Sequence, residues 1–184
     1  MQNIELKIKV GDFRDIRRKL DDLGGIFKGK MHQIDTYYNK NNARLKIREI
    51  NNKTFEIISY RRPNTSGHKI SNYNIKPLSG HECQLQKSQL RNTLGERVIV
   101  DKIRRLWLYK NTRIHLDKVK KLGNYLELET VVRGDIEEAM GEFNLVVRNL
   151  KLERFEKIAG SYSDIVLRQN DNIYPGHLLI RKYA

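Results

Sequence analysis

The residues best suited to chemistry are basic side chains spaced two apart on predicted β-strands. Arg44, Lys46 and Arg48 alternate with apolar residues, and Lys102 and Arg104 repeat the spacing further along the chain. Because successive side chains of a strand point to opposite faces, each basic set shares one face. Guanidinium and ammonium groups in this arrangement are typical of sites that bind phosphate oxygens.

A second group of predicted strands carries acidic side chains at the same spacing. Glu127 and Glu129 share one face of a strand, and Arg113, His115 and Asp117 share one face of the strand before it. Grouped carboxylates are typical ligands of hard divalent cations, which prefer oxygen donors. A metal-bound polyphosphate would satisfy the basic and the acidic side chains together.

The pattern alone leaves two arrangements of these strands open. In an open sheet with helices on its apolar face, the charged face would be solvated, and cross-strand salt bridges would contribute little per pair. In a closed barrel, the charged faces would line a polar, water-filled interior in which basic strands face acidic ones. Only the closed barrel would gather the charged side chains into one ligand-binding site.

Alternation, helical periodicity and turn residues predict the elements that position these side chains. A helix follows the first strand, with Asp12 as its cap and apolar residues from Phe13 to Leu23, and another begins after Asp135 and extends to Leu150. Residues 1–170 are expected to form a single domain and residues 171–184 a C-terminal tail. The remaining predictions are strands at 3–10, 32–39, 43–50, 54–62, 68–76, 97–109, 112–119 and 124–132, and helices at 83–94 and about 160–169.

Composition narrows the class of protein. A chain of 184 residues is long enough for one well-packed core, and it contains no apolar run long enough to span a bilayer. Cys83 is the only cysteine, so no internal disulfide forms, and we expect a cytoplasmic protein. The net charge of +14 attracts polyanions such as nucleic acid, anionic lipid or a phosphorylated ligand, although it also serves solubility.

The motifs and their order resemble the CYTH superfamily, the triphosphate tunnel metalloenzymes, which includes class IV adenylyl cyclases and thiamine triphosphatases. The resemblance runs from Asn3 to about Arg168. The segments that carry it are Asn3-Ile4-Glu5-Leu6-Lys7, Gln33-Ile34-Asp35-Thr36-Tyr37-Tyr38, Arg44-Leu45-Lys46-Ile47-Arg48-Glu49, Ile58-Ser59-Tyr60-Arg61-Arg62-Pro63-Asn64, Gly67-His68-Lys69, Lys102-Ile103-Arg104-Arg105, Ile114-His115-Leu116-Asp117, Leu122-Gly123-Asn124-Tyr125-Leu126-Glu127-Leu128-Glu129 and Ser161-Tyr162-Ser163-Asp164.

This resemblance implies an α+β fold, in which an eight-stranded antiparallel β-barrel encloses a tunnel and helices pack outside, and it implies Mg²⁺ or Mn²⁺ as cofactor. The residues that correspond to the phosphate side are Lys7, Lys46, Arg48, Arg62, Lys102, Arg104 and Arg113. Those on the metal side are Glu5, Asp117, Glu127 and Glu129, and the catalytic residues are Glu5, Lys7, Glu127 and Glu129. The family's first motif reads Glu-x-Glu-x-Lys, so Asn3 removes one carboxylate and weakens a metal site or leaves a single one.

Two reactions fit such a tunnel. A metal-activated water that attacks the terminal phosphorus gives a triphosphatase, whereas a ribose 3′-hydroxyl that attacks the α-phosphorus gives a cyclase that releases pyrophosphate. We favour hydrolysis slightly, because it places fewer demands on geometry. The expected partner is a triphosphorylated small molecule or nucleotide, bound by a monomer or homodimer without a membrane.

A module that binds nucleic acid without catalysis is the alternative from another class. The basic segments Arg17-Arg18-Lys19 and Lys118 with Lys120-Lys121 lie outside the proposed tunnel and would bind phosphates without sequence preference. An RNA 5′-triphosphatase would combine both interpretations. An acidic wall argues against a pure binder, since it would repel a phosphate backbone in the absence of metal.

Other conspicuous residues are interpreted as structural. The five histidines show no metal-ligand spacing, although His115 shares a strand face with Asp117 and is the one that could reach the tunnel. We expect Trp107 in the core, Cys83 to be inert, and Tyr37 and Tyr60 to serve packing.

Overall fold

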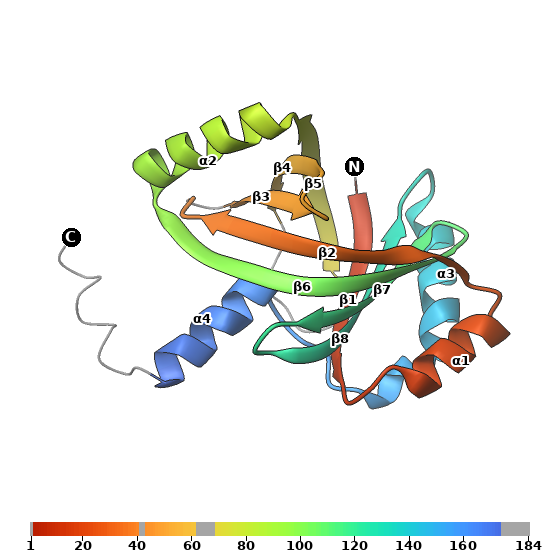
Figure 1. The fold of residues 1–184 in the computed structure, drawn as a ribbon. Helices are drawn as coiled ribbons and strands as arrows, with labels where there is room; N and C mark the ends of the chain where they lie inside the picture. Colours follow the sequence, from red (N-terminus) through yellow and green to blue (C-terminus); the bar gives the residue numbers. More distant parts are fainter. Residues whose placement is uncertain (1, 41–42, 62–68, 174–184) are drawn as a thin grey trace.

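The computed structural model describes residues 2–40, 43–61 and 69–173. These residues form eight β-strands and four α-helices (Figure 1). The strands are β1 (Gln2–Val10), β2 (Ile26–Tyr38), β3 (Arg44–Ile50), β4 (Thr54–Arg61), β5 (Lys69–Leu78), β6 (Glu96–Tyr109), β7 (Thr112–Val119) and β8 (Gly123–Val131). The helices are α1 (Arg14–Asp22), α2 (Gly80–Leu94), α3 (Ile136–Asn149) and α4 (Tyr162–Ile173), with a 3₁₀ turn at Leu152–Arg154.

The strands close into an antiparallel barrel in the order β1-β5-β4-β3-β2-β6-β7-β8, and β8 pairs with β1. The predicted eight-stranded antiparallel barrel with helices outside is therefore confirmed. Three joints connect strands that are distant in sequence, namely β1 with β5, β1 with β8 and β2 with β6. These joints bring the acidic strand β8 beside the first strand of the chain.

The hydrophobic core lies outside the barrel, between the strands and the helices. Alternation along β1 turns Ile4, Leu6 and Ile8 outward, where they pack with Leu126 and Leu128 of β8. The apolar faces of α1 and α3 cover this surface, and the two helices lie together at one end of the barrel in Figure 1. Along β1 the apolar side chains that predicted the strand thus face the helices, and the inward positions carry the polar Asn3, Glu5 and Lys7.

Helix α2 covers a second part of the barrel. Cys83 is fully buried there with Tyr38 and Ile47, which supports the expectation of an inert cysteine. The helix begins three residues earlier than predicted because Ser79 and Glu82 form a capping box: the Ser79 hydroxyl accepts from the Glu82 N–H at 3.2 Å, and the Glu82 carboxylate accepts from the Ser79 N–H at 2.7 Å.

Three other predictions of element boundaries were wrong. The N-cap of α1 is Phe13 and not the predicted Asp12, although the Asp12 carboxylate accepts from the N–H of Arg14, the first residue of the helix, at 2.8 Å. Strand β2 begins at Ile26, earlier than the predicted start at residue 32. The prediction missed its first residues because a bulge next to Gly29 interrupts their alternation.

Helix α4 continues to Ile173, past the predicted end of the domain at residue 170. The boundary between domain and tail stays a prediction. The end of the expected 54–62 strand, the loop after it and the tail from residue 174 lie outside the described residues.

No helix in the described part of the chain is long and apolar enough to cross a bilayer.

We predict that Leu128→Ala lowers the free energy of unfolding by about 2–5 kcal/mol, because the fully buried side chain would leave a cavity beneath the helices. Chemical denaturation measured by circular dichroism checks this value. Leu85→Ala is the matched control, since Leu85 on α2 is 49% exposed and its truncation should leave the transition midpoint nearly unchanged. Equal losses in both variants would contradict the placement of the core.

Candidate active site

The interior of the barrel holds a cavity of about 270 Å³ that is lined by side chains from all eight strands. We call this cavity the tunnel. On β1 the alternation turns Glu5 and Lys7 inward, and the start of α4 contributes Tyr162. The Tyr162 ring packs under the Lys7 ammonium, which lies 4.0 Å from the ring centroid.

One basic group of the tunnel is organised around Asp35 of β2. Its carboxylate accepts two hydrogen bonds from Arg48, at 2.7 and 3.0 Å, and one from Lys46 at 2.8 Å. Burial alone would raise the pKa of Asp35, but the charges of Arg48 and Lys46 hold it well below its usual value. Burial, together with the neighbouring Arg48, lowers the pKa of Lys46 to about 7. Asp35 therefore fixes both cations in the tunnel wall.

Asp117 of β7 organises a second basic group in the same way. It is fully buried and accepts two hydrogen bonds from Arg104, at 2.7 and 2.6 Å, and one from Lys102 at 3.2 Å. The Tyr162 hydroxyl donates to it at 3.0 Å. Although burial would raise the pKa of Asp117, the charges of Arg104 and Lys102 keep it well below its usual value. The structure thus places this carboxylate behind the tunnel wall, in contact with cations.

Strand β8 supplies the acidic wall. Its neighbours are β1 and β7, so Glu129 lies opposite Glu5 on one side and Arg113 on the other. Arg113 pairs with Glu129 at 2.9 Å. Burial would raise the pKa of Glu129, but the neighbouring His115, Arg113 and Arg104 bring it to about 2. Glu5 and Glu129 are therefore like charges at directly opposed positions, an arrangement that costs stability unless a cation lies nearby.

Glu127 is the second acidic residue of this wall. It lies opposite Lys7 on β1 and pairs with it at 3.0 Å, and Arg104 reaches the same carboxylate at 2.6 Å. The charges of Lys7 and Arg104 overcome the effect of burial and hold the pKa of Glu127 well below its usual value. Both carboxylates of β8 are therefore ionised at neutral pH.

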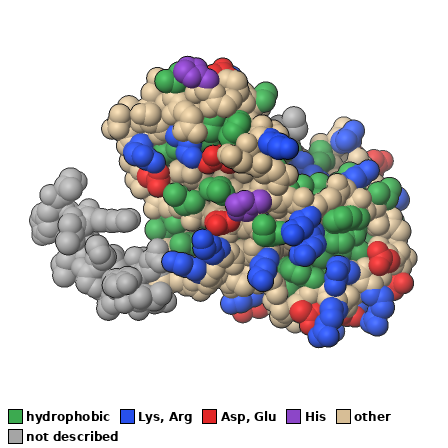
Figure 2. All heavy atoms as spheres, viewed as in Figure 1, with side chains coloured by type: hydrophobic (Ala, Val, Ile, Leu, Met, Phe, Trp, Pro, Cys, Tyr) green, Lys and Arg blue, Asp and Glu red, His purple; other side chains and the backbone are tan. Residues whose placement is uncertain are grey.

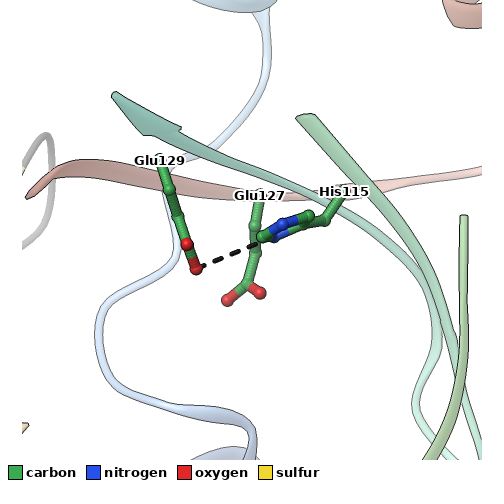
Figure 3. A group of neighbouring side chains, drawn as sticks. All are labelled: His115, Glu127 and Glu129. Carbon is green, nitrogen blue, oxygen red and sulfur yellow. Dashed lines mark ion pairs between the residues drawn. The ribbon is translucent and has the colours of Figure 1, made fainter. Parts of the chain in front are cut away.

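His115 completes this wall (Figure 3). One ligand atom from each of His115, Glu127 and Glu129 lies within 4.8 Å of the other two. The buried Nδ1 of His115 makes no hydrogen bond, and it lies 3.7 Å from the Glu129 carboxylate. Burial and the neighbouring Arg104 lower the pKa of His115 to about 3, so the imidazole is neutral at physiological pH. An unsatisfied imidazole nitrogen beside two carboxylates fits a divalent cation.

Asn3 stands where the family motif has its first glutamate. The side chain is buried, and in the amide orientation that satisfies both of its polar atoms it accepts from Arg113 at 2.8 Å and donates to the backbone of Gln2 at 3.1 Å. A neutral acceptor at this position holds Arg113 without neutralising it, so the charge of Arg113 remains for Glu129 or for a ligand.

The wall formed by β4 and β5 has a different character. It presents Ile58, Tyr60, Tyr73 and Ile75 to the tunnel, and Ile75 is 38% exposed there. Glu56 is the one charged residue that these strands contribute to the lining among the described residues. This neutral wall suits an organic group better than a phosphate.

The charges that line the tunnel nearly balance. Of the predicted phosphate-side residues, Arg62 lies outside the described residues and the other six line the tunnel. The six cations are Lys7, Lys46, Arg48, Lys102, Arg104 and Arg113, and the acidic residues of the lining are Glu5, Asp35, Glu56, Glu127 and Glu129. Since most of these cations already have an acidic partner, a phosphate group must compete with carboxylates unless a metal ion neutralises them.

Comparison with known proteins places this barrel in a family. The CYTH domain profile matches residues 1–162. The chain belongs to the CYTH family. The match includes all eight strands of the barrel and ends at the first residue of α4.

Similar proteins cover nearly the full chain. A candidate adenylate cyclase of Methanocaldococcus jannaschii is 26% identical over 177 residues, which are 90% of this chain and 98% of the relative. A solved structure from Pyrococcus horikoshii is 25% identical, with a TM-score of 0.76 over 88% of this chain and 98% of that one. A Hippeastrum protein, described as a candidate adenylyl cyclase with a dominant triphosphatase activity, shares the fold at 14% identity, with a TM-score of 0.62 over 91% and 96% of the two chains.

Several residues of the tunnel were not identified from the sequence. Setting His115 aside was wrong, since its neutral imidazole joins the acidic wall. Tyr37 and Tyr60 were assigned to packing, yet both line the tunnel. The role of Asp35 was missed, although its position two residues before Tyr37 on one strand face was a usable signal. The segment of Tyr162 was noted, but its place in the tunnel was not predicted, because helix α4 approaches the barrel only in the tertiary structure.

We predict that Asp35→Asn lowers the free energy of unfolding by about 3–5 kcal/mol, because it leaves two buried cations without their counter-ion. Urea denaturation at pH 7 measures the change. Asp12→Asn removes an aspartate that also pairs with an arginine, but on the exposed surface, and it should not shift the transition. A stable Asp35→Asn variant would show that the pair does not hold this wall.

Proposed function

We propose that this chain is a metal-dependent enzyme that acts on a triphosphate-bearing substrate, and that its main reaction is hydrolysis of the terminal phosphate. The observation that carries the proposal is that one tunnel holds both cations and a possible set of metal ligands. The cations of β3 and β6 line the same interior as the cluster of His115, Glu127 and Glu129. A polyphosphate that brings a divalent cation complements both sets of side chains.

The basic groups act by positioning and by neutralising charge. Asp35 holds Lys46 and Arg48 in place, and Asp117 holds Lys102 and Arg104, so these cations need little reorganisation when phosphate oxygens arrive. Phosphoryl transfer needs this kind of preorganised charge and little covalent participation from the protein.

The acidic wall provides the metal site in this proposal, with Glu127, Glu129 and His115 as ligands and Glu5 beside them. A bound divalent cation supplies a polarised phosphate oxygen and a water of lowered pKa. Because the set mixes imidazole and carboxylate, we expect Mn²⁺ to bind more tightly than Mg²⁺, which prefers oxygen ligands. When the carboxylates are neutralised in this way, Lys7, Arg104 and Arg113 become available to the substrate.

Cyclisation of ATP is the second candidate reaction. The neutral wall of β4 and β5 could receive a nucleobase, and the relative with 26% identity is a candidate adenylate cyclase. We place hydrolysis first because a water can reach the terminal phosphorus without a fixed ribose. The fold does not discriminate, since the Hippeastrum protein of this fold combines both descriptions.

Product analysis decides between the two reactions. We expect orthophosphate from ATP, GTP or inorganic triphosphate with Mg²⁺ or Mn²⁺, none with chelator, and at least a 100-fold loss of turnover in Glu127→Gln/Glu129→Gln. Chromatographic detection of cyclic AMP and pyrophosphate in place of orthophosphate would establish the cyclase. Glu137→Gln/Glu138→Gln on the exposed start of α3 is the matched control and should keep full activity. Turnover that is unaffected by chelator would refute the metal-dependent proposal.

A separate measurement tests the imidazole ligand. We predict that His115→Ala weakens Mn²⁺ binding at least tenfold while Mg²⁺ binding changes less, since imidazole favours the softer ion. Titration calorimetry without substrate gives both affinities. Equal losses for the two metals, or no loss for either, would remove His115 from the ligand set.

A further inference from the structure

Outside the tunnel, the outer surface of β2, β6 and β7 carries basic side chains in adjacent rows. Lys30 and Arg105 are directly opposed across β2 and β6, and Lys118 of β7 is opposed to Ile103, two residues from Arg105. These positions face outward because their chain neighbours Met31 and Arg104 line the tunnel. Cross-strand neighbours of this kind lie roughly 5 to 8 Å apart. Lys28, at the bulge of β2, is also exposed and outside the tunnel lining. We call Lys28, Lys30, Arg105 and Lys118 the outer basic face.

These four cations lack compensating charges. Within the described residues, none of them forms an ion pair, whereas the neighbouring Asp101 is engaged by His32 at 2.7 Å and by Lys120 at 3.6 Å. Like charges at directly opposed positions destabilise a sheet. In Figure 2, Lys and Arg side chains are spread over this face of the molecule, with some Asp and Glu side chains among them. The arrangement carries a cost that an anionic partner would offset.

An aromatic side chain lies at one end of this face. Phe27 is 52% exposed, and its ring packs at 4.6 Å on that of Trp107, the residue opposed to it across β2 and β6. Trp107 is buried and supports the Phe27 ring, which stays half exposed next to Lys28 in the chain. An exposed aromatic ring next to cations is typical of surfaces that bind single-stranded nucleic acid, where bases stack on the ring and phosphates meet the cations.

We propose that the outer basic face and Phe27 bind single-stranded nucleic acid. The site is separate from the tunnel, since neither Phe27 nor the four cations belong to the tunnel lining. Phosphates would lie along the cations, and a base would stack on Phe27. Recognition of this kind has little sequence preference and depends strongly on salt.

The test uses a labelled 12-nucleotide RNA with a 5′-hydroxyl, so that no triphosphate can occupy the tunnel. Fluorescence anisotropy should show binding that weakens more than tenfold between 50 and 200 mM salt, as expected for about three phosphate contacts. Lys28→Glu/Lys30→Glu/Lys118→Glu, which changes exposed residues only, should weaken binding at least tenfold. Phe27→Ala should weaken it at least fivefold, in line with the loss of one stacked base.

The matched control is Lys76→Glu/Arg133→Glu/Arg148→Glu, which reverses three exposed cations on β5, after β8 and on α3. This variant has the same net charge as the first triple variant and should bind RNA within about threefold of the wild type. Equal losses in the two triple variants would show that net charge alone attracts RNA, and would overturn the site. Retained binding by Phe27→Ala, tighter binding of duplex than of single strands, or capture by phosphatidylserine vesicles in preference to RNA would overturn it as well.

Discussion

A closed barrel removes the inner faces of its strands from bulk water, so each charge placed there needs a partner. This constraint determines the interior of the tunnel. Asp35 and Asp117 are almost completely buried, and each binds one lysine and one arginine that lie two residues apart on the neighbouring strand. Removing one member of such a group leaves uncompensated charge, which costs far more than the group gains over apolar packing. The interior is therefore stable only as a connected set.

The two aspartate groups give the tunnel an approximate internal symmetry. In one group, Lys46 and Arg48 of β3 bind Asp35 on the neighbouring strand β2. In the other, Lys102 and Arg104 of β6 bind Asp117 on the neighbouring strand β7 in the same way. Since β2 and β6 are paired, the two groups meet along one joint of the barrel. The acidic wall formed by β8 breaks this symmetry. That asymmetry gives the tunnel a cationic side and a side suited to a metal ion.

The strands β1, β3, β7 and β8, and the face to which each of their side chains points, could be predicted from the sequence because the alternation in them is regular. The charged set of β3 and the acidic set of β8 were placed on the correct inner face for this reason. The partners of each charge could not be derived, because they depend on joints between strands distant in sequence, such as β1 with β8. The pairing of Glu127 with Lys7, and the arrival of Tyr162 from α4, are consequences of that closure. The two wrong starts of elements have different causes. The bulge near Gly29 obscured the start of β2, whereas the capping box of α2 could be recognised in the sequence and was overlooked.

The net charge of +14 is not the charge of the tunnel. Six cations and five carboxylates line the cavity, so the described lining accounts for at most one of the fourteen charges. A tunnel close to neutrality gains affinity for a polyphosphate through preorganised groups and a metal ion, and excess charge contributes little there. The remaining positive charge lies elsewhere on the molecule, where salt screens it and its effect falls within about 10 Å of the surface. The net charge therefore reflects the outer surface of the protein, whereas the tunnel is nearly neutral. A ligand of the tunnel does not explain the positive charge outside it.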